Sequence, residues 1–168
     1  MSAIMNEITI NPEGMTPFFQ VRPEKRMRFS WDKLDKNVVM DLVRTIFGDT
    51  QITMTVLIGY SYGLYFVKEK TGIGKFFTIT NWKEAYIDSE DREFRFLLAQ
   101  IERIKKDELI NYCMKIKNSY PQAYITFNNE RSFLYVSTDV MDIVSQDKDL
   151  ISDLKKKYQG IVDVYWEA

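Results

Sequence analysis

The sequence predicts an α+β fold in a single domain spanning residues 1–168. The length suits one ordinary domain with a hydrophobic core, and 45% of the residues are hydrophobic and 28% charged, as in a typical globular protein. Along the chain, apolar residues at helical spacing alternate with apolar residues at every second position, which favours strands. The strand patterns come in pairs separated by short turns. We therefore expect antiparallel sheet(s) built from hairpins, with helices packed on one face.

The predicted order of elements is roughly β-α-β-β-β-α-α-β-β-α-β, and it begins with an extended N-terminal arm over residues 1–26. Three prolines and a glycine interrupt any regular element in this arm. Phe18 and Phe19 are expected to pin it to the rest of the domain. Residues 27–29 are predicted to form a short strand.

A helix is predicted over residues 34–47, where apolar positions recur at four-residue spacing: Leu34, Val38, Leu42 and Ile46. Asp32 or Asp35 is the expected N-cap, and Gly48 follows the helix where a terminating glycine belongs. The next block is predicted to be β-rich, with strands at 52–58, 60–69 and 75–80. The Thr-Gly-Ile-Gly turn at 71–74 joins the last two of these strands.

Ser89 is the predicted N-cap of a further helical region, because acidic residues fill the first turn after it. Its apolar stripe runs over 94–104, loses register and resumes over 109–120, which indicates two helices or one bent helix ending before Pro121.

The last part of the chain contains five more predicted elements. A hairpin is expected from strands 124–127 and 133–138. A short helix over 139–144, a helix over 148–158 and a final strand over 162–166 are expected to follow it.

Catalytic and metal-binding chemistry finds little support in the composition. The chain has no histidine, which is the usual general base near neutral pH and a common metal ligand. Its single cysteine, Cys113, lies on an apolar helical stripe and is predicted to be a buried hydrophobic residue. Residues 71–75 resemble part of a phosphate-binding loop but lack the required first glycine and the final hydroxyl. We therefore expect no enzyme, no metal site and no cofactor.

The net charge and the first ten residues predict where in the cell the protein is found. The net charge is −1, so no overall electrostatic attraction to nucleic acid or to an acidic membrane is expected. The first ten residues carry no signal-peptide pattern, and the longest apolar stretches are far shorter than a membrane span. These features predict a cytoplasmic protein without membrane contact.

One region stands out as a candidate binding surface, because aromatic residues and lysines are interleaved within it. If residues 60–68 form one strand, one face carries Tyr60, Tyr62, Leu64, Phe66 and Lys68, and the other carries Tyr65 and Val67. The tentative binding residues are Tyr60, Tyr62, Tyr65, Lys68, Lys70, Lys75 and Trp82.

Two functions remain open for this surface. The first is a non-enzymatic module that binds another protein, as an inhibitor, immunity protein or accessory factor does; tyrosine and tryptophan are frequent anchors in such interfaces. The second is a binder of single-stranded DNA or RNA, in which aromatic rings stack on bases and lysines contact phosphates. Burial of the aromatic face beneath a helix would favour the first, and an open face beside lysines the second. A homodimer through an edge strand at Tyr165 and Trp166 is a third expectation.

Overall fold

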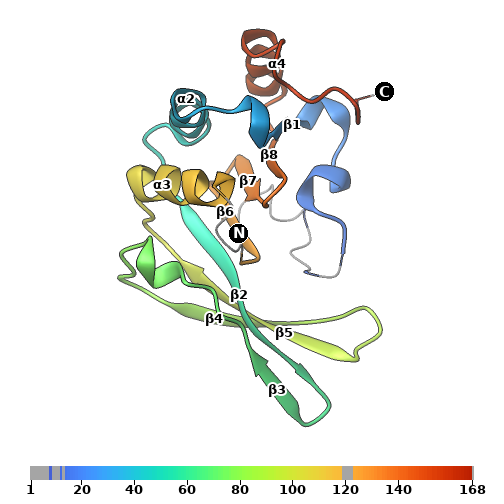
Figure 1. Ribbon diagram of the computed structural model, residues 1–168. Coiled ribbons are helices and arrows are strands. Elements are labelled where there is room, and N and C mark those ends of the chain that lie inside the picture. Colours follow the sequence, from blue (N-terminus) through green and yellow to red (C-terminus); the bar gives the residue numbers. More distant parts are fainter. Residues whose placement is uncertain (1–7, 9–11, 13, 119–122, 168) are drawn as a thin grey trace.

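Eight strands form one antiparallel sheet, and three α-helices pack against it, among the residues that the structure describes (Figure 1). The structure is a computed structural model, and it describes residues 8, 12, 14–118 and 123–167. The elements in chain order are η1 (Pro17–Gln20), η2 (Pro23–Lys25), β1 (Arg26–Ser30), η3 (Trp31–Lys33), α2 (Lys36–Phe47), β2 (Thr53–Tyr62), β3 (Tyr65–Lys68), η4 (Ile73–Lys75), β4 (Lys83–Asp88), β5 (Phe94–Ile101), α3 (Lys106–Lys117), β6 (Ile125–Asn128), β7 (Ser132–Val136), β8 (Val140–Ser145) and α4 (Lys148–Lys157), where η denotes a 3₁₀ helix.

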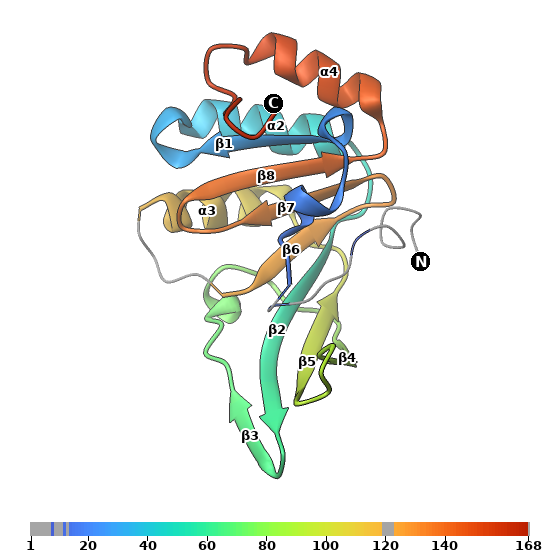
Figure 2. The ribbon, with the colours of Figure 1, turned by 90° about the vertical axis from the view of Figure 1, so that its right-hand side faces the viewer.

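Strand β2 joins two parts of the sheet. The strand order is β1-β8-β7-β6-β2-β5-β4. Strand β3 is not part of this row, and it pairs with β2. The first half of β2 pairs with β6, whereas its second half, from Gly59 to Tyr62, pairs with β3. Figure 2 shows β2 running out of the main body of the protein, with β3 on one side and β5 on the other. We call this outer part, made by Gly59–Tyr62, β3, β4 and Phe94–Leu97, the sheet extension.

Helix α2 forms where the apolar spacing predicts it. The side chain of Asp35 caps its first turn by accepting a hydrogen bond from the backbone N–H of Val38 at 2.9 Å. Gly48 follows the helix with a φ of +53°, a conformation that favours glycine. Of the two expected N-caps, Asp35 is the residue that caps the helix.

The main core lies between one face of the sheet and all three helices. Residues from β2, β5 and β6 meet residues from α2, α3 and α4 there: Met54, Ile101, Phe127, Leu42, Cys113 and Ile151 are all buried in one cluster. This arrangement confirms the predicted α+β class and the antiparallel sheet with helices on one face. In the described residues, no helix is long and apolar enough to cross a membrane.

The opposite face of the sheet carries a second, smaller cluster and a buried ion pair. Arg28 on β1 donates two hydrogen bonds to the carboxylate of Asp142 on β8, at 2.6 and 2.8 Å. Phe18 from η1 covers the pair, with its ring centroid 4.3 Å from the Arg28 guanidinium carbon. Phe18 is fully buried, whereas Phe19 is partly exposed. The rest of the predicted N-terminal arm includes residues 1–7, 9–11 and 13, which lie outside the described residues.

The predicted helix over 94–104 is wrong, because Phe94–Ile101 form strand β5. Phe94, Phe96 and Leu98 pack on one face of the sheet and Leu97, Ala99 and Ile101 on the other. A strand buried on both faces gives a continuous apolar run, which periodicity cannot distinguish from a helix. Ser89 does not cap a helix either. Its hydroxyl accepts a hydrogen bond from the N–H of Phe94 across the β4–β5 turn.

Three further predicted elements differ from the structure. Residues 139–144 lie mostly in strand β8, where Met141 and Ile143 alternate with Asp142 and Val144 across the sheet. The strand predicted over 75–80 is replaced by η4 and an irregular segment. The strand predicted over 162–166 is reduced to a single bridge between Phe29 and Val162. The observed order is therefore β-α-β-β-β-β-α-β-β-β-α.

Candidate binding surface

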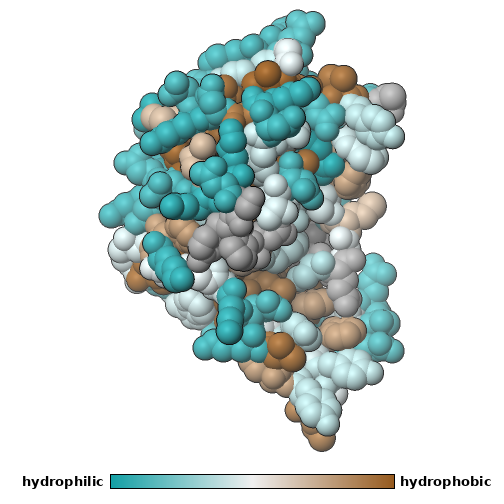
Figure 3. Space-filling view, in the orientation of Figure 1, coloured by the Kyte–Doolittle hydropathy of each residue, from teal (hydrophilic) through white to brown (hydrophobic). Residues whose placement is uncertain are grey.

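The sheet extension and its flanking segments carry most of the exposed large hydrophobic side chains of the described residues. These are Tyr62, Leu64, Tyr65, Phe66, Val67, Ile79, Trp82 and Tyr86. In Figure 3, brown and pale side chains gather at the lower end of the molecule, where Figure 1 places the extension. Exposed apolar side chains that gather at one end of a folded domain are typical of an interaction surface.

One face of the extension is aromatic. Tyr62 lies opposite Tyr65 on β3 and opposite Phe94 on β5, and its ring centroid is 5.1 Å from that of Phe94. Tyr60 and Val67 face each other two pairs further along, on the same face. Tyr62 and Tyr65 are 52% and 77% exposed, so their rings are open to solvent. We call Tyr60, Tyr62, Tyr65, Val67 and Phe94 the aromatic face.

The predicted distribution of side chains over the two faces is wrong, because residues 60–68 form a hairpin rather than one strand. Gly63 and Leu64 make its turn, with Gly63 in the left-handed conformation at a φ of +58°. After the turn, Tyr65 returns to the side of Tyr62, and Phe66 goes to the other side with Lys68. A glycine between two aromatic runs is a recognised hairpin signal.

The other face of the extension contains a pocket of about 450 Å³. Ile58, Phe66 and Leu97 line it from the sheet. Residues 69–82, the crossover segment, run from β3 to β4 and contribute further lining residues, among them Trp82. The indole Nε1 of Trp82 donates a hydrogen bond to Glu84 at 2.9 Å. The pocket is therefore mainly apolar, with charged groups at its rim.

The crossover segment is held firmly against the body. Ile73 and Phe77 are buried in the main core. Thr78 donates two hydrogen bonds to the carboxylate of Glu108 on α3, from its backbone N–H at 3.1 Å and from its hydroxyl at 2.7 Å. Asn81 forms two more with the backbone of Glu102, at 2.8 and 2.7 Å. The wall of the pocket is thus fixed by contacts outside the extension.

The structure divides the seven predicted binding residues among three places. Tyr60, Tyr62 and Tyr65 lie together on the aromatic face. Lys68 and Trp82 line the pocket on the opposite face. Lys70 and Lys75 are exposed on the crossover segment. The aromatic rings and the lysines therefore do not form the single face that the sequence predicted.

The charges of the extension cancel when the crossover segment and the β4–β5 turn are counted with it. Residues 60–95 carry six basic and six acidic side chains. Arg95 and Asp88 form an exposed ion pair at 2.8 Å, and the hydrogen bond from Arg95 lowers the pKa of Asp88 below its ordinary value. A surface without excess positive charge has no electrostatic preference for phosphates.

Other groups of ionisable side chains have structural partners. Burial raises the pKa of the Asp142 carboxyl, and the hydrogen bonds from Arg28 oppose that shift. Burial also raises the pKa of the Cys113 thiol to about 12, which leaves it protonated and unreactive at neutral pH. Within the described residues, no group of three or more carboxylate or cysteine side chains could hold a metal ion.

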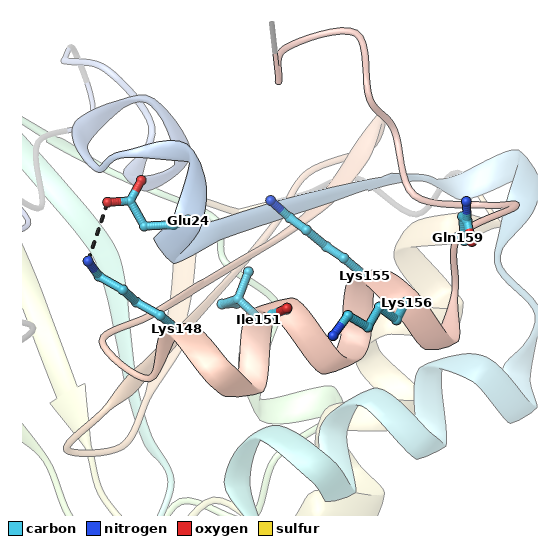
Figure 4. A pocket seen from close by; sticks show the side chains of 7 residues that line it. Glu24, Lys148, Ile151, Lys155, Lys156 and Gln159 are labelled. Atoms are coloured by element: carbon cyan, nitrogen blue, oxygen red, sulfur yellow. Dashed lines mark ion pairs between the residues drawn. The ribbon is translucent and has the colours of Figure 1, made fainter.

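A second pocket, of about 410 Å³, lies beside α4 and is lined by three lysines (Figure 4). Lys148 pairs with Glu24 at 3.4 Å. Lys155 pairs with Glu167 at 2.6 Å and donates to the carbonyl oxygen of Pro23 at 2.9 Å. Two of the three lysines are therefore already neutralised, which makes this pocket a weaker candidate for an anion than its composition suggests.

Comparisons with protein-family models, with curated proteins and with solved structures found no match for this chain.

Proposed function

We propose that this protein is a non-enzymatic binding protein that contacts a partner protein through the aromatic face of its sheet extension, as an inhibitor, immunity or accessory protein would. The observation that carries the proposal is the pair of open rings at Tyr62 and Tyr65, which lie opposite each other on a two-stranded hairpin. Tyrosine supplies a large contact area and loses little conformational entropy when it is bound.

The setting of the pair supports a protein partner rather than a small ligand. The tyrosines lie on an outer surface, whereas a small-molecule site is usually concave. The neighbouring rings of Phe94 and Phe96 are half-buried and buried, and they stack at a centroid distance of 6.4 Å. They give the tyrosines a fixed base, so little ordering is required on binding.

The balanced charge of the extension also supports this choice. An interface core is depleted of charged residues, and its charges lie at the rim. The five residues of the aromatic face carry no charge, and the ion pair of Arg95 and Asp88 lies on the opposite face of the same strands. A partner protein can cover such a surface without leaving an unpaired charge buried.

Affinity capture with matched variants tests the proposal. The parent protein, immobilised and exposed to a lysate of its source cell, is expected to retain one stoichiometric partner. The double variant Tyr62→Ser/Tyr65→Ser should lose that partner, with an affinity at least about thirtyfold weaker, as for other tyrosine hot spots. The control Tyr165→Ser removes an equally exposed ring, 77% accessible, from the C-terminal segment and should retain it. No stoichiometric partner, or equal capture by the double variant, would refute the proposal.

Single-stranded DNA or RNA is the second candidate ligand. In its favour, the rings of Tyr62 and Tyr65 are open rather than buried beneath a helix, as expected for this candidate, and they can stack on bases as the rings of single-strand binders do. Against it, Lys68, the lysine of β3, lies on the opposite face, and Lys83 on β4 is the strand lysine on the side of Phe94. Fluorescence anisotropy of a labelled oligonucleotide, titrated with protein at low and at moderate salt, separates the two functions. Binding that weakens steeply with salt would favour nucleic acid, whereas no binding at low salt would exclude it.

A further inference from the structure

We propose that Ile8 of the N-terminal arm is an autoinhibitory contact: it occupies the inner end of the partner-binding surface, and the partner protein displaces it with an aliphatic side chain carried on an extended segment. This inference rests on the proposed function, because it concerns the regulation of the same surface. It names a side chain of this protein that competes with the partner, and the chemistry of the partner segment that replaces it.

The aromatic face continues into the part of the sheet on which Ile8 lies. Figure 2 shows β2 and β5 running side by side from the extension into the main body. Phe94, Phe96 and Leu98 follow one another on the same face of β5, from its outer end inward. Tyr60 and Phe94, two members of the aromatic face, are half-buried and pack against the small cluster that contains Ile8. A partner that covers the aromatic face and follows the strands inward therefore reaches Ile8.

Ile8 can leave this position without disrupting the rest of the fold. It is 4% exposed, and the described residues buried with it in the small cluster all come from the sheet: Leu57, Phe96, Leu98, Phe133 and Val144. These strands pair with one another, and Ile8 belongs to no strand. The main core is closed by three helices on the other face of the sheet. Release of Ile8 therefore breaks no strand pairing and leaves the main core covered.

Two threonines lie in the middle of the surface beneath this cluster. Thr55 on β2 and Thr126 on β6 are paired across the two strands. On this face of the sheet the pair stands between Leu57, two residues further along β2, and Phe133, which pairs with Asn128 two residues further along β6. The apolar groups that Ile8 covers are thus separated by a polar pair.

The hydroxyls of this pair indicate that Ile8 is not the best occupant of its site. Thr55 and Thr126 are buried, at 1% and 0% exposure, and neither hydroxyl has a hydrogen-bond partner within the described chain. A buried hydroxyl without a partner costs free energy, and an aliphatic side chain cannot relieve that cost. An extended partner segment brings backbone N–H and C=O groups as well as an apolar side chain. Such a segment can satisfy the threonines and fill the place of Ile8 together.

A competing contact of this kind has a measurable consequence. The apparent affinity for the partner is reduced to the extent that the site is occupied by Ile8, because only the open molecules bind. Removal of the isoleucine side chain therefore strengthens binding although it adds no contact. A side chain that contributed to the interface, or only to the core, would not have this effect.

Affinity capture compares the full-length parent with Ile8→Ser. The partner retained from a lysate of the source cell should bind Ile8→Ser about tenfold more tightly than the parent. Val162→Ser removes another nearly buried aliphatic side chain, at the edge of the main core, and should bind as the parent does. Equal or weaker binding by Ile8→Ser would overturn the inference. Capture of a second copy of this chain in place of another protein would overturn it too, since the site would then belong to the arm of that copy.

Removal of the threonine hydroxyls tests the chemistry of the partner segment. Thr55→Val/Thr126→Val should bind the partner at least about fivefold more weakly, because hydrogen bonds made only in the complex are lost. The free protein should not lose stability, since the hydroxyls have no partner in it. Thr45→Val, at an exposed position of α2, is the control and should leave the affinity unchanged. Unchanged affinity of the double variant would overturn the assignment of an extended segment.

Thiol labelling tests the release of Ile8 without any partner. Cys113 is buried and is the only cysteine of the chain, so a thiol introduced by Ile8→Cys reports on this site. In native buffer it should react with an aromatic disulfide reagent at least about tenfold more slowly than the thiol of Met15→Cys, at an exposed position, and long before Cys113 reacts. A rate equal to that of Met15→Cys, or one as slow as that of Cys113, would overturn the inference.

The outcomes separate this inference from the proposed function. A partner that is lost by Tyr62→Ser/Tyr65→Ser but bound equally by the parent and Ile8→Ser would overturn the autoinhibitory contact and leave the proposed function standing. Absence of a partner for both the parent and Ile8→Ser would refute the proposed function itself, and the inference would fall with it whatever the labelling rates.

Discussion

The ring of Phe66 on β3 lies on the backbone of Gly59 on β2, two residues before Ser61, which is the residue that Phe66 pairs with. A Cβ atom added to Gly59 would lie 2.5 Å from Cζ of Phe66 and 2.9 Å from the carbonyl oxygen of Val67. The first contact involves a side chain that can move, but the second involves the backbone of a paired strand. Glycine at this position therefore permits β3 to lie close to β2 and Phe66 to line the pocket.

Gly59→Ala is therefore expected to destabilise the protein by about 1–3 kcal/mol, as overpacking usually does. The free energy of unfolding from urea titrations measures it. Gly74→Ala is the matched control, because nothing lies within 4 Å of the Cβ it would add. That control should change the free energy by less than about 0.5 kcal/mol. Equal effects of the two substitutions would contradict the close approach.

The buried pair of Arg28 and Asp142 leads to a second prediction. Asp142→Asn keeps the shape of the side chain but leaves the Arg28 charge buried without its partner. The expected cost is about 3–5 kcal/mol in the free energy of unfolding. Arg28→Met/Asp142→Leu removes both charges and should recover most of this loss. A double variant less stable than Asp142→Asn would show that the pair contributes net stability.

The contact between α2 and α4 gives a prediction of pH dependence. Asp41 accepts hydrogen bonds from Lys157 and from the hydroxyl of Tyr158, and these lower its pKa below the ordinary value of 3.8. A lowered pKa in the folded state means that the carboxylate stabilises the fold above about pH 4. This stability is lost as the pH falls through the folded-state pKa.

Asp41→Asn should therefore reduce stability at pH 7, by about 0.5–1 kcal/mol because Asp41 is partly exposed. The difference between the parent and the variant should shrink as the pH is lowered below 3.8, where the parent loses the same charge. Urea titrations of both proteins at pH 7 and in the acid range measure it. A difference that grows on acidification would contradict the assigned sign.

The extent of correct prediction from sequence depends on how many faces of an element are buried. Helix α2 has one buried stripe, so its period is visible in the sequence, and the N-cap Asp35 marks its start. Strand β5 packs on both faces, and its continuous apolar run predicts a helix that does not form. The difference arises because the spacing of apolar residues distinguishes a helix from a strand only where part of the element faces water.

The candidate surface, too, could be predicted from the sequence only in part. The cluster of aromatic residues at 60–86 is visible in the sequence, and the structure places most of them on the extension. Their division between faces depended on one turn at Gly63, which reverses the alternation after Tyr62. The pocket could not be predicted, because Ile58 and Leu97 meet Trp82 only through the path of the crossover segment.

The reactivity of Cys113 gives a fourth prediction. Its side chain is fully buried in the main core, and burial raises the pKa of its thiol to about 12. An aromatic disulfide reagent should therefore leave the folded protein unmodified and react with one thiol after denaturation in guanidinium. Rapid modification of the folded protein would show that α3 opens easily, since the thiol is reached only when the helix leaves the core.

The last prediction separates binding from folding at the aromatic face. Tyr62 and Tyr65 are open to solvent, so Tyr62→Ser/Tyr65→Ser should alter the free energy of unfolding by less than about 1 kcal/mol, as surface substitutions do. Phe127→Ala, at a fully buried ring, should cost about 3–5 kcal/mol. Guanidinium titrations compare the two. If the tyrosine variant proved as costly as Phe127→Ala, the rings would be part of the core, and loss of a partner in that variant would reflect unfolding. A stable variant that loses its partner would assign these rings to binding, because exposed aromatic side chains that add no stability are otherwise only an aggregation hazard.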